Sequence, residues 1–158
     1  MSIKKFTPTK GNGRDVYVLK DAKLIYKNFS GTRGKFPGSS SVNVVVSEED
    51  AKKLEAWGLP CNCRENPDGE NQYSVRLNVK FNVRPPEVIQ ILPSGSNLIL
   101  DEELIKKLDD LSIASANVAW TYGYGSGKPV AYLNKMEVSI VPSIFSDDAS
   151  DYYIETDG

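Results

Sequence analysis

The chain has 158 residues, of which 40% are hydrophobic and 25% are charged, the composition of one ordinary globular domain. It contains no histidine, which excludes a Ser-His-Asp triad, a His-ligated metal and an imidazole base. The formal net charge is −2, but residues 1–40 carry +7 from nine basic and two acidic residues, whereas residues 144–158 hold five acidic residues and no basic one. This charge asymmetry is the first indication of function.

The beginning of the chain predicts a flexible arm and two strand regions. Proline and glycine favour a flexible arm over residues 1–14, and this arm is basic. Mixed apolar and polar residues over 16–29 indicate strand structure, and a glycine-rich basic connection leads from there to a second strand over 41–46. Three residues of this connection are candidates for ligand contact: Arg33, Lys35 and Phe36.

A helix and the most regular strand follow. Ser47 and the acidic residues after it resemble a capping box, which predicts a helix over residues 48–57. The polar segment 59–72 predicts a loop. Apolar and polar residues then alternate from Tyr73 to Arg84, so one strand face points to a core and the other to solvent. The solvent face carries cations at intervals of about 13 Å in an extended strand: Arg76, Lys80 and Arg84.

The second half predicts a short strand over 87–92, a helix and a hairpin. Asp101 can cap the helix, whose apolar stripe comprises Leu104, Ile105, Leu108 and Leu111. Strands over 114–124 and 130–141 flank a glycine-rich segment that lacks the Walker spacing and predicts a hairpin tip. Six or seven strands with one or two helices favour a mainly β fold, an antiparallel barrel that leaves few exposed edges.

Neither the cysteines nor the acidic residues predict a metal site. Cys61 and Cys63 are too few for tetrahedral zinc and are interpreted as reduced thiols. The acidic residues at both ends of helix 101–110 are interpreted as caps and a solvated face, with a magnesium-dependent nuclease kept as an alternative. No apolar run reaches the roughly 20 residues that span a bilayer, so we expect a cytoplasmic protein without metal or cofactor.

Cations interleaved with aromatic rings are the strongest functional signal. Single-stranded nucleic acid needs cations along its phosphates and rings under its bases. Tyr26 and Tyr73 are weak candidates because they fall on the apolar faces of their strands. The candidate nucleic-acid contacts are Lys23, Lys27, Arg33, Lys35, Phe36, Arg76, Lys80, Arg84, Trp120, Tyr122, Tyr124, Lys128 and Tyr132. A solvated outer face with the rings in the core is the alternative interpretation.

Several short motifs carry a family resemblance. They are LIYKNFSG (24–31), Phe36 with Gly38, VNVVV (42–46), Trp57-Gly58 and AYLNKMEV (131–138). In these motifs the chain resembles phage-encoded single-stranded DNA-binding proteins over most of positions 22–141. The resemblance implies an OB-like barrel without enzymatic activity, which coats single-stranded DNA during phage replication or recombination with little sequence preference. We assign this domain to residues 15–143, in the cytoplasm of an infected bacterial host.

The acidic segment 144–158 has no periodicity and is expected to be disordered. It can dock on a replication or recombination partner, occupy the basic groove of its own chain, or merely solubilise the protein. Its candidate partner-binding residues are Asp147, Asp148, Asp151, Tyr152, Tyr153, Glu155 and Asp157. A phage protein-interaction module or host-enzyme inhibitor, acting through exposed aromatics and this segment, is the alternative function, and a homo-oligomer stays open.

Overall fold

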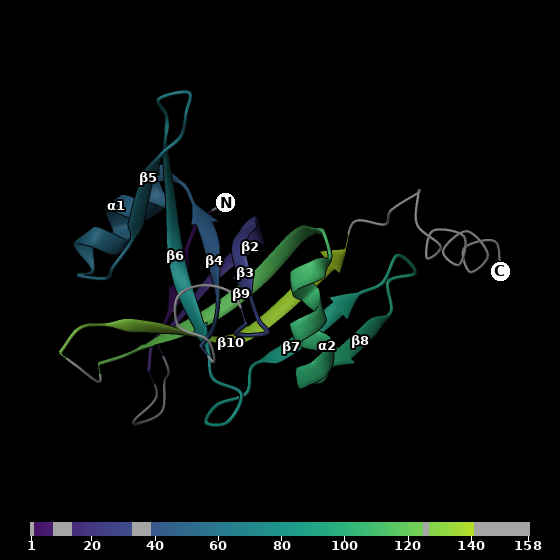
Figure 1. Ribbon diagram of the computed structural model, residues 1–158. Helices are drawn as coiled ribbons and strands as arrows, with labels where there is room; N and C mark the ends of the chain where they lie inside the picture. Colours follow the sequence, from purple (N-terminus) through teal and green to yellow (C-terminus); the bar gives the residue numbers. More distant parts are fainter. Residues whose placement is uncertain (1, 8–13, 33–38, 125–126, 141–158) are drawn as a thin grey trace.

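The computed structural model describes residues 2–7, 14–32, 39–124 and 127–140. Within these ranges the chain is mainly β, as predicted, with ten strands, two α-helices and one 3-10 helix (Figure 1). The strands are β1 (Lys4–Phe6), β2 (Val16–Ala22), β3 (Leu24–Asn28), β4 (Ser40–Val46), β5 (Asn62–Glu65), β6 (Asn71–Val79), β7 (Glu87–Ile91), β8 (Asn97–Leu100), β9 (Ile113–Gly123) and β10 (Val130–Ile140). The helices are α1 (Glu48–Ala56), α2 (Glu102–Lys107) and the 3-10 helix η1 (Leu108–Asp110).

One sheet contains all of these strands. Its main path runs β1-β2-β9-β10-β6-β4-β3, with β5 beside β6 and the β7–β8 hairpin beside β10. Figure 1 shows β4 and β6 crossing β9 and β10 steeply, so the sheet folds over on itself. Two pairings depart from the expected antiparallel arrangement, because β10 runs parallel to β6 and β7. Among the described residues no ladder joins β1 to β3, so the sheet is not closed by hydrogen bonds.

The core lies between the two crossing parts of the sheet. Val44 and Leu77 from one part and Trp120 and Leu133 from the other belong to one apolar cluster, and none is more than 2% exposed. The predicted alternation of the third strand region is confirmed for its central residues, because Val75, Leu77 and Val79 are buried. The residues between them in β6 therefore face away from the core.

The alternation ends earlier than predicted. β6 stops at Val79, and the backbone then turns so that the N–H of Arg84 donates to the carbonyl of Lys80 at 2.9 Å. Val83, predicted on the apolar face, is 76% exposed. The sequence prediction took the two prolines after Arg84 as the end of the strand, because proline supplies no backbone donor, but the ladder ends six residues before the first of them.

Helix α1 begins as predicted and also anchors the N-terminal segment. The Ser47 hydroxyl accepts from the Asp50 amide at 3.1 Å, and the helix ends at Ala56, next to the C-cap Trp57. The buried Asp50 carboxylate accepts from the amide of Ile3 at 3.0 Å, and Ile3 itself is buried. β1 pairs with β2, so residues 4–6 of the predicted flexible arm belong to the sheet. Burial of Ile3 is a tertiary effect that no local pattern indicates.

Two segments predicted without regular structure are strands. β5 lies inside the predicted loop 59–72 and pairs antiparallel with β6. β8, to which no strand was assigned, pairs with β7. Both are edge strands whose side chains are largely exposed, so they show little of the alternation by which strands are recognised.

Helix α2 is capped by Asp101, as predicted, and buries only half of its expected apolar stripe. The Asp101 carboxylate accepts from the Leu104 amide at 2.9 Å. Ile105 and Leu108 are buried, whereas Leu104 and Leu111 are exposed. No helix in the described part of the chain is both long and apolar enough to cross a membrane.

Candidate nucleic-acid interface

The outer face is the side of β4, β6, β10 and β9 turned away from the core. Strand register aligns Asn43 with Arg76, and it aligns Ser41, Asn78, Tyr132 and Thr121 in a row across the four strands. Neighbouring strands are about 4.8 Å apart, so this row spans roughly 14 Å. The outer face comprises Ser41, Asn43, Ser74, Arg76, Asn78, Thr121 and Tyr132.

Most of the outer face is a floor of small polar side chains that bond to one another or to the backbone. The Asn43 amide donates to the Ser74 hydroxyl at 3.1 Å. The Asn78 amide donates to the carbonyl of Ala131 at 3.1 Å, which ties β6 to β10. Ser74 and Asn43 are both buried. A ligand on this face therefore meets the larger side chains that rise beside the floor.

A tyrosine flanked by cations stands on this floor. Asn78 is the register partner of Tyr132, with Arg76 two residues before it and Lys80 two residues after it. Two residues of a strand span about 7 Å, so both cations start within one nucleotide-sized step of the ring. Arg76 and Lys80 are exposed, and Tyr132 is half-buried. The structure thus brings together three predicted contacts that are distant in sequence.

The turn after β6 changes the predicted spacing of the cations. The sequence predicted Arg84 about 13 Å beyond Lys80 on one straight strand. Instead Lys80 and Arg84 are bridge partners, because the backbone reverses between them. Both are exposed, and so are Lys23 and Lys128. The two bridge partners form a cluster at the end of the outer face rather than a continuation of its row.

Lys27, a predicted phosphate contact, has its ammonium group bonded to the protein itself. Its ammonium group donates to the carbonyl of Leu108 at 3.0 Å and to the carbonyl of Leu111. These carbonyls lie at the end of α2 and η1, where the helix dipole favours a cation. Nothing in the sequence near Lys27 indicated that a helix end would lie beside it.

Trp120 and Tyr122, predicted to stack on bases, lie in the core. Trp120 is 0% exposed and Tyr122 is 4% exposed. The ring of Tyr17 lies 5.1 Å from that of Tyr122, edge to face, and 6.3 Å from that of Trp120. Burial raises the pKa of the Tyr122 hydroxyl to about 12. Rings packed on one another in this way offer no face to a base.

Tyr124 and Arg14 extend the candidate interface toward the hairpin of β9 and β10. The predicted antiparallel pairing of these two strands is confirmed. Tyr124 is 64% exposed, and Arg14 was missing from the predicted contacts. With Tyr122 they line a hollow of about 320 Å³. A methyl group on Gly123 would lie 2.9 Å from the Tyr132 ring and 3.3 Å from the Arg14 guanidinium, so both side chains pack on the bare backbone there.

Tyr26, a weak candidate because its strand pattern predicts an apolar face, is exposed in the structure. Its side chain is 54% exposed, and its hydroxyl accepts from the Arg64 guanidinium at 2.6 Å. The two residues come from β3 and β5 and line a hollow of about 580 Å³. Their 38-residue separation left no pattern that could have linked them.

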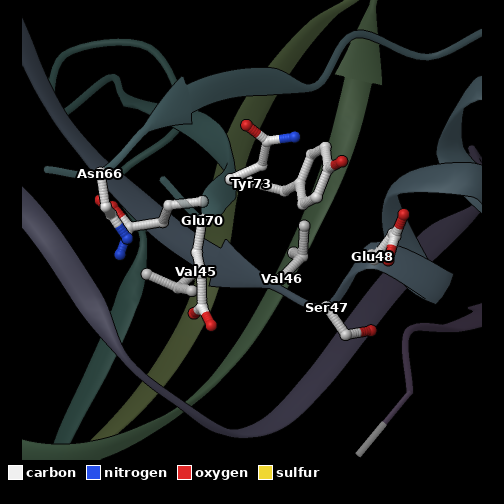
Figure 2. Close-up of a pocket in the computed structure, with 9 residues that line it drawn as sticks. Val45, Val46, Ser47, Glu48, Asn66, Glu70 and Tyr73 are labelled. Carbon is white, nitrogen blue, oxygen red and sulfur yellow. The ribbon is translucent and has the colours of Figure 1, made fainter. Parts of the chain in front are cut away.

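An acidic hollow lies beside this one. It measures about 480 Å³, and its lining includes Glu48 and Glu70 (Figure 2). Asn66 and Gln72 line both hollows. Carboxylates repel phosphate, so the acidic hollow marks a boundary of the candidate interface.

The acidic residues near α2 serve the fold. The Asp109 carboxylate accepts from the amides of Phe29 and Ser30, and Glu102 forms an ion pair with Lys106 at 2.9 Å. In the ranges that the structure describes, no group of three His, Cys, Asp or Glu side chains is arranged to hold a metal ion. Cys61 and Cys63 are free thiols, as predicted.

Several predicted contacts lie outside the described residues. These are Arg33, Lys35 and Phe36 in the basic connection, together with the whole acidic segment 144–158.

Comparison with known proteins gives a likeness of fold. No protein-family model matches the sequence, and no curated protein matches it. The solved single-stranded DNA-binding protein from bacteriophage Enc34 superimposes with a TM-score of 0.50 at 10% identity, covering 95% of this chain and 99% of that one. Its C-terminal truncation gives 0.47 at 8% identity over 89% and 97%, and its complex with single-stranded DNA gives 0.46 at 10% identity over 83% and 89%. The first likeness supports the expected OB-like fold.

Proposed function

We propose that this protein binds single-stranded DNA on its outer face, with little sequence preference and without catalysing a reaction. The observation that carries the proposal is the half-buried Tyr132 between the exposed cations Arg76 and Lys80. The fold that the chain shares with the Enc34 single-stranded DNA-binding protein supports it.

The outer face has the chemistry that a single strand needs. Arginine and lysine neutralise phosphates, and a tyrosine ring stacks on any base, because every base has a π-face. The floor of Asn43, Ser74 and Asn78 is uncharged, so it does not repel the backbone of a strand. A ring and cations without a dense set of base-reading side chains favour sequence-tolerant binding.

The biological role follows as part of the same proposal. A protein that coats single strands protects them during phage replication or recombination, in the cytoplasm of the infected bacterium. The acidic segment 144–158 recruits replication or recombination proteins, or competes with DNA for the cations of the outer face. The binding domain then corresponds to residues 15–143, and the basic segment 1–14 that precedes it contributes β1 to the sheet and Arg14 to the interface.

Fluorescence anisotropy of a labelled oligo-dT tests the proposal at two salt concentrations. We expect salt-sensitive binding, because each neutralised phosphate releases condensed counterions. Arg76→Ala should weaken binding and lower the salt slope by about one phosphate, whereas Tyr132→Ala should weaken it by roughly 5- to 100-fold with the slope unchanged.

Lys52→Ala, an exposed cation on α1, is the matched control and should bind as the parent protein does. Thermal melts of all variants check that they are folded. No binding of oligo-dT by the full chain would refute the proposal. A protein-interaction module would instead bind its partner through a contact that changes little with salt.

A further inference from the structure

Tyr26 has an unusual backbone conformation for its residue type. Its φ is +52°, in the left-handed region, where a bulky side chain is a true outlier. The register between β3 and β4 is interrupted at this point, between Ile25 and Asn28. Strained residues of this kind persist where the surrounding structure holds them, and they cluster at ligand sites.

The conformation sends the ring away from the core and across the outer face. Tyr26 is 54% exposed, although its sequence pattern predicted an apolar face. β4 and β6 lie between β3 and β5 in the sheet, yet the Tyr26 hydroxyl reaches the Arg64 guanidinium of β5. The pair therefore spans the two strands between them.

The hollow between these two side chains has the lining that a nucleotide requires. Its volume is about 580 Å³, and the amides of Asn66 and Gln72 join Tyr26 and Arg64 around it. Amide groups donate and accept, so they can meet the polar edge of any base. Glu65 also lines the hollow. Its carboxylate repels phosphate, so we expect the phosphate at Arg64 and the uncharged base in the rest of the hollow.

Among the residues that the structure describes, most donors of Arg64 stay available for a ligand. A guanidinium group has five N–H donors in a planar fork, and the structure uses one of them on Tyr26. The hydrogen bond also fixes the orientation of the ring, so little side-chain freedom is lost when a base stacks on it.

The hollow is continuous with the outer face. Arg64 pairs with Gln72, and Gln72 and Arg76 lie on the same face of β6, four residues apart. Four residues of a strand span about 13 Å, so a strand of DNA bound at Arg76 extends to Tyr26 within a few nucleotides.

We infer that Tyr26 and Arg64 form a nucleotide subsite, in which the ring stacks on a base and the guanidinium binds the adjacent phosphate. This inference rests on the proposed function and assigns the part of the interface that lies on β3 and β5. It also gives a reason for the strained backbone at Tyr26, because strained residues cluster at ligand sites.

Three variants and one control test the subsite by oligo-dT anisotropy. Tyr26→Gly removes the ring but suits a φ of +52°, so it should fold and bind roughly 5- to 100-fold more weakly. Tyr26→Phe keeps the ring and should bind within about threefold of the parent protein. Arg64→Ala should bind more weakly with a salt slope smaller by about one phosphate. Ile99→Ala, at a 72% exposed position on β8, should change nothing.

Photo-crosslinking distinguishes a contact with DNA from a purely structural role, because a residue that only stabilises the fold would not crosslink to the oligonucleotide. An oligonucleotide that carries bromodeoxyuridine should crosslink to the peptide containing Tyr26, as identified by mass spectrometry. Absence of binding by the parent protein would refute the proposed function as a whole. Parent-like binding by Tyr26→Gly, equal losses in Tyr26→Gly and Tyr26→Phe, or absence of the crosslink in a protein that binds DNA would overturn the subsite alone.

Discussion

Asp109 connects the end of η1 to the turn after β3, and its replacement by asparagine tests whether this connection stabilises the fold. The two carboxylate oxygens accept from the amides of Phe29 at 2.7 Å and Ser30 at 3.0 Å. Asp109 is 8% exposed and Phe29 is 0% exposed, so water cannot replace these bonds readily. Asparagine has one acceptor oxygen where aspartate has two, so one amide loses its partner.

The magnitude follows from the burial of these groups. An unsatisfied buried donor costs about 1–3 kcal/mol, and the remaining bond also loses its charge assistance. We therefore expect Asp109→Asn to lower the free energy of unfolding by about 2–3 kcal/mol. With a urea m-value of about 2 kcal/mol/M, the unfolding midpoint should fall by roughly 1 M with m unchanged.

Urea unfolding followed by tryptophan fluorescence measures this shift. Glu55→Gln is the matched control, because it removes the same charge from an exposed position at the end of α1 and should change stability by less than about 0.5 kcal/mol. If Asp109→Asn unfolds at the same urea concentration as the parent protein or this control, the two amides do not depend on the carboxylate and the reasoning is refuted.

Two further predictions follow from the packing near the hairpin. Gly123→Ala puts a methyl group 2.9 Å from the Tyr132 ring, so the ring must move. Oligo-dT binding should then weaken several-fold, while the melting temperature changes less than in Asp109→Asn. Parent-like affinity would show that the position of the Tyr132 ring is irrelevant to binding. Burial raises the pKa of Tyr122 to about 12 from its ordinary value of 10, so the unfolded chain ionises first. The contribution of the neutral Tyr122 hydroxyl to the free energy of unfolding should then be fully present below about pH 10. Urea unfolding should show the free energy of unfolding falling by roughly 2–3 kcal/mol as the pH rises to about 12, and Tyr122→Phe should lack this fall.

Local signals predicted the elements whose formation depends on nearby residues. The Ser47 and Asp101 caps need only the backbone amides three residues ahead, and both are present. The alternation around Leu77 is likewise a property of one strand against one core. Edge strands such as β5 were missed because their order comes from pairing with a neighbour, which composition does not reveal.

The candidate site shows the same division more sharply. Trp120 and Tyr122 of β9 and Tyr124 directly after it alternate on one side in the sequence, so the sequence pattern treats them alike. In the fold the first two are buried and both pack against the ring of Tyr17 from β2, whereas Tyr124 is exposed. Lys27 and Arg76 are equivalent in the sequence pattern, because both are cations on predicted strands. In the structure they differ, because the ammonium group of Lys27 donates to carbonyls at a helix end.

The sequence by itself determined the mainly β class, the helix starts, the hairpin and the interleaving of cations with aromatic rings that suits a single strand. These depend on composition and on periods of a few residues, which any short segment carries within itself. The tertiary structure alone decided which cations and rings are available, and it brought Tyr26 to Arg64 and Tyr132 between Arg76 and Lys80. Exposure and proximity are set by long-range packing, so no local pattern contains them.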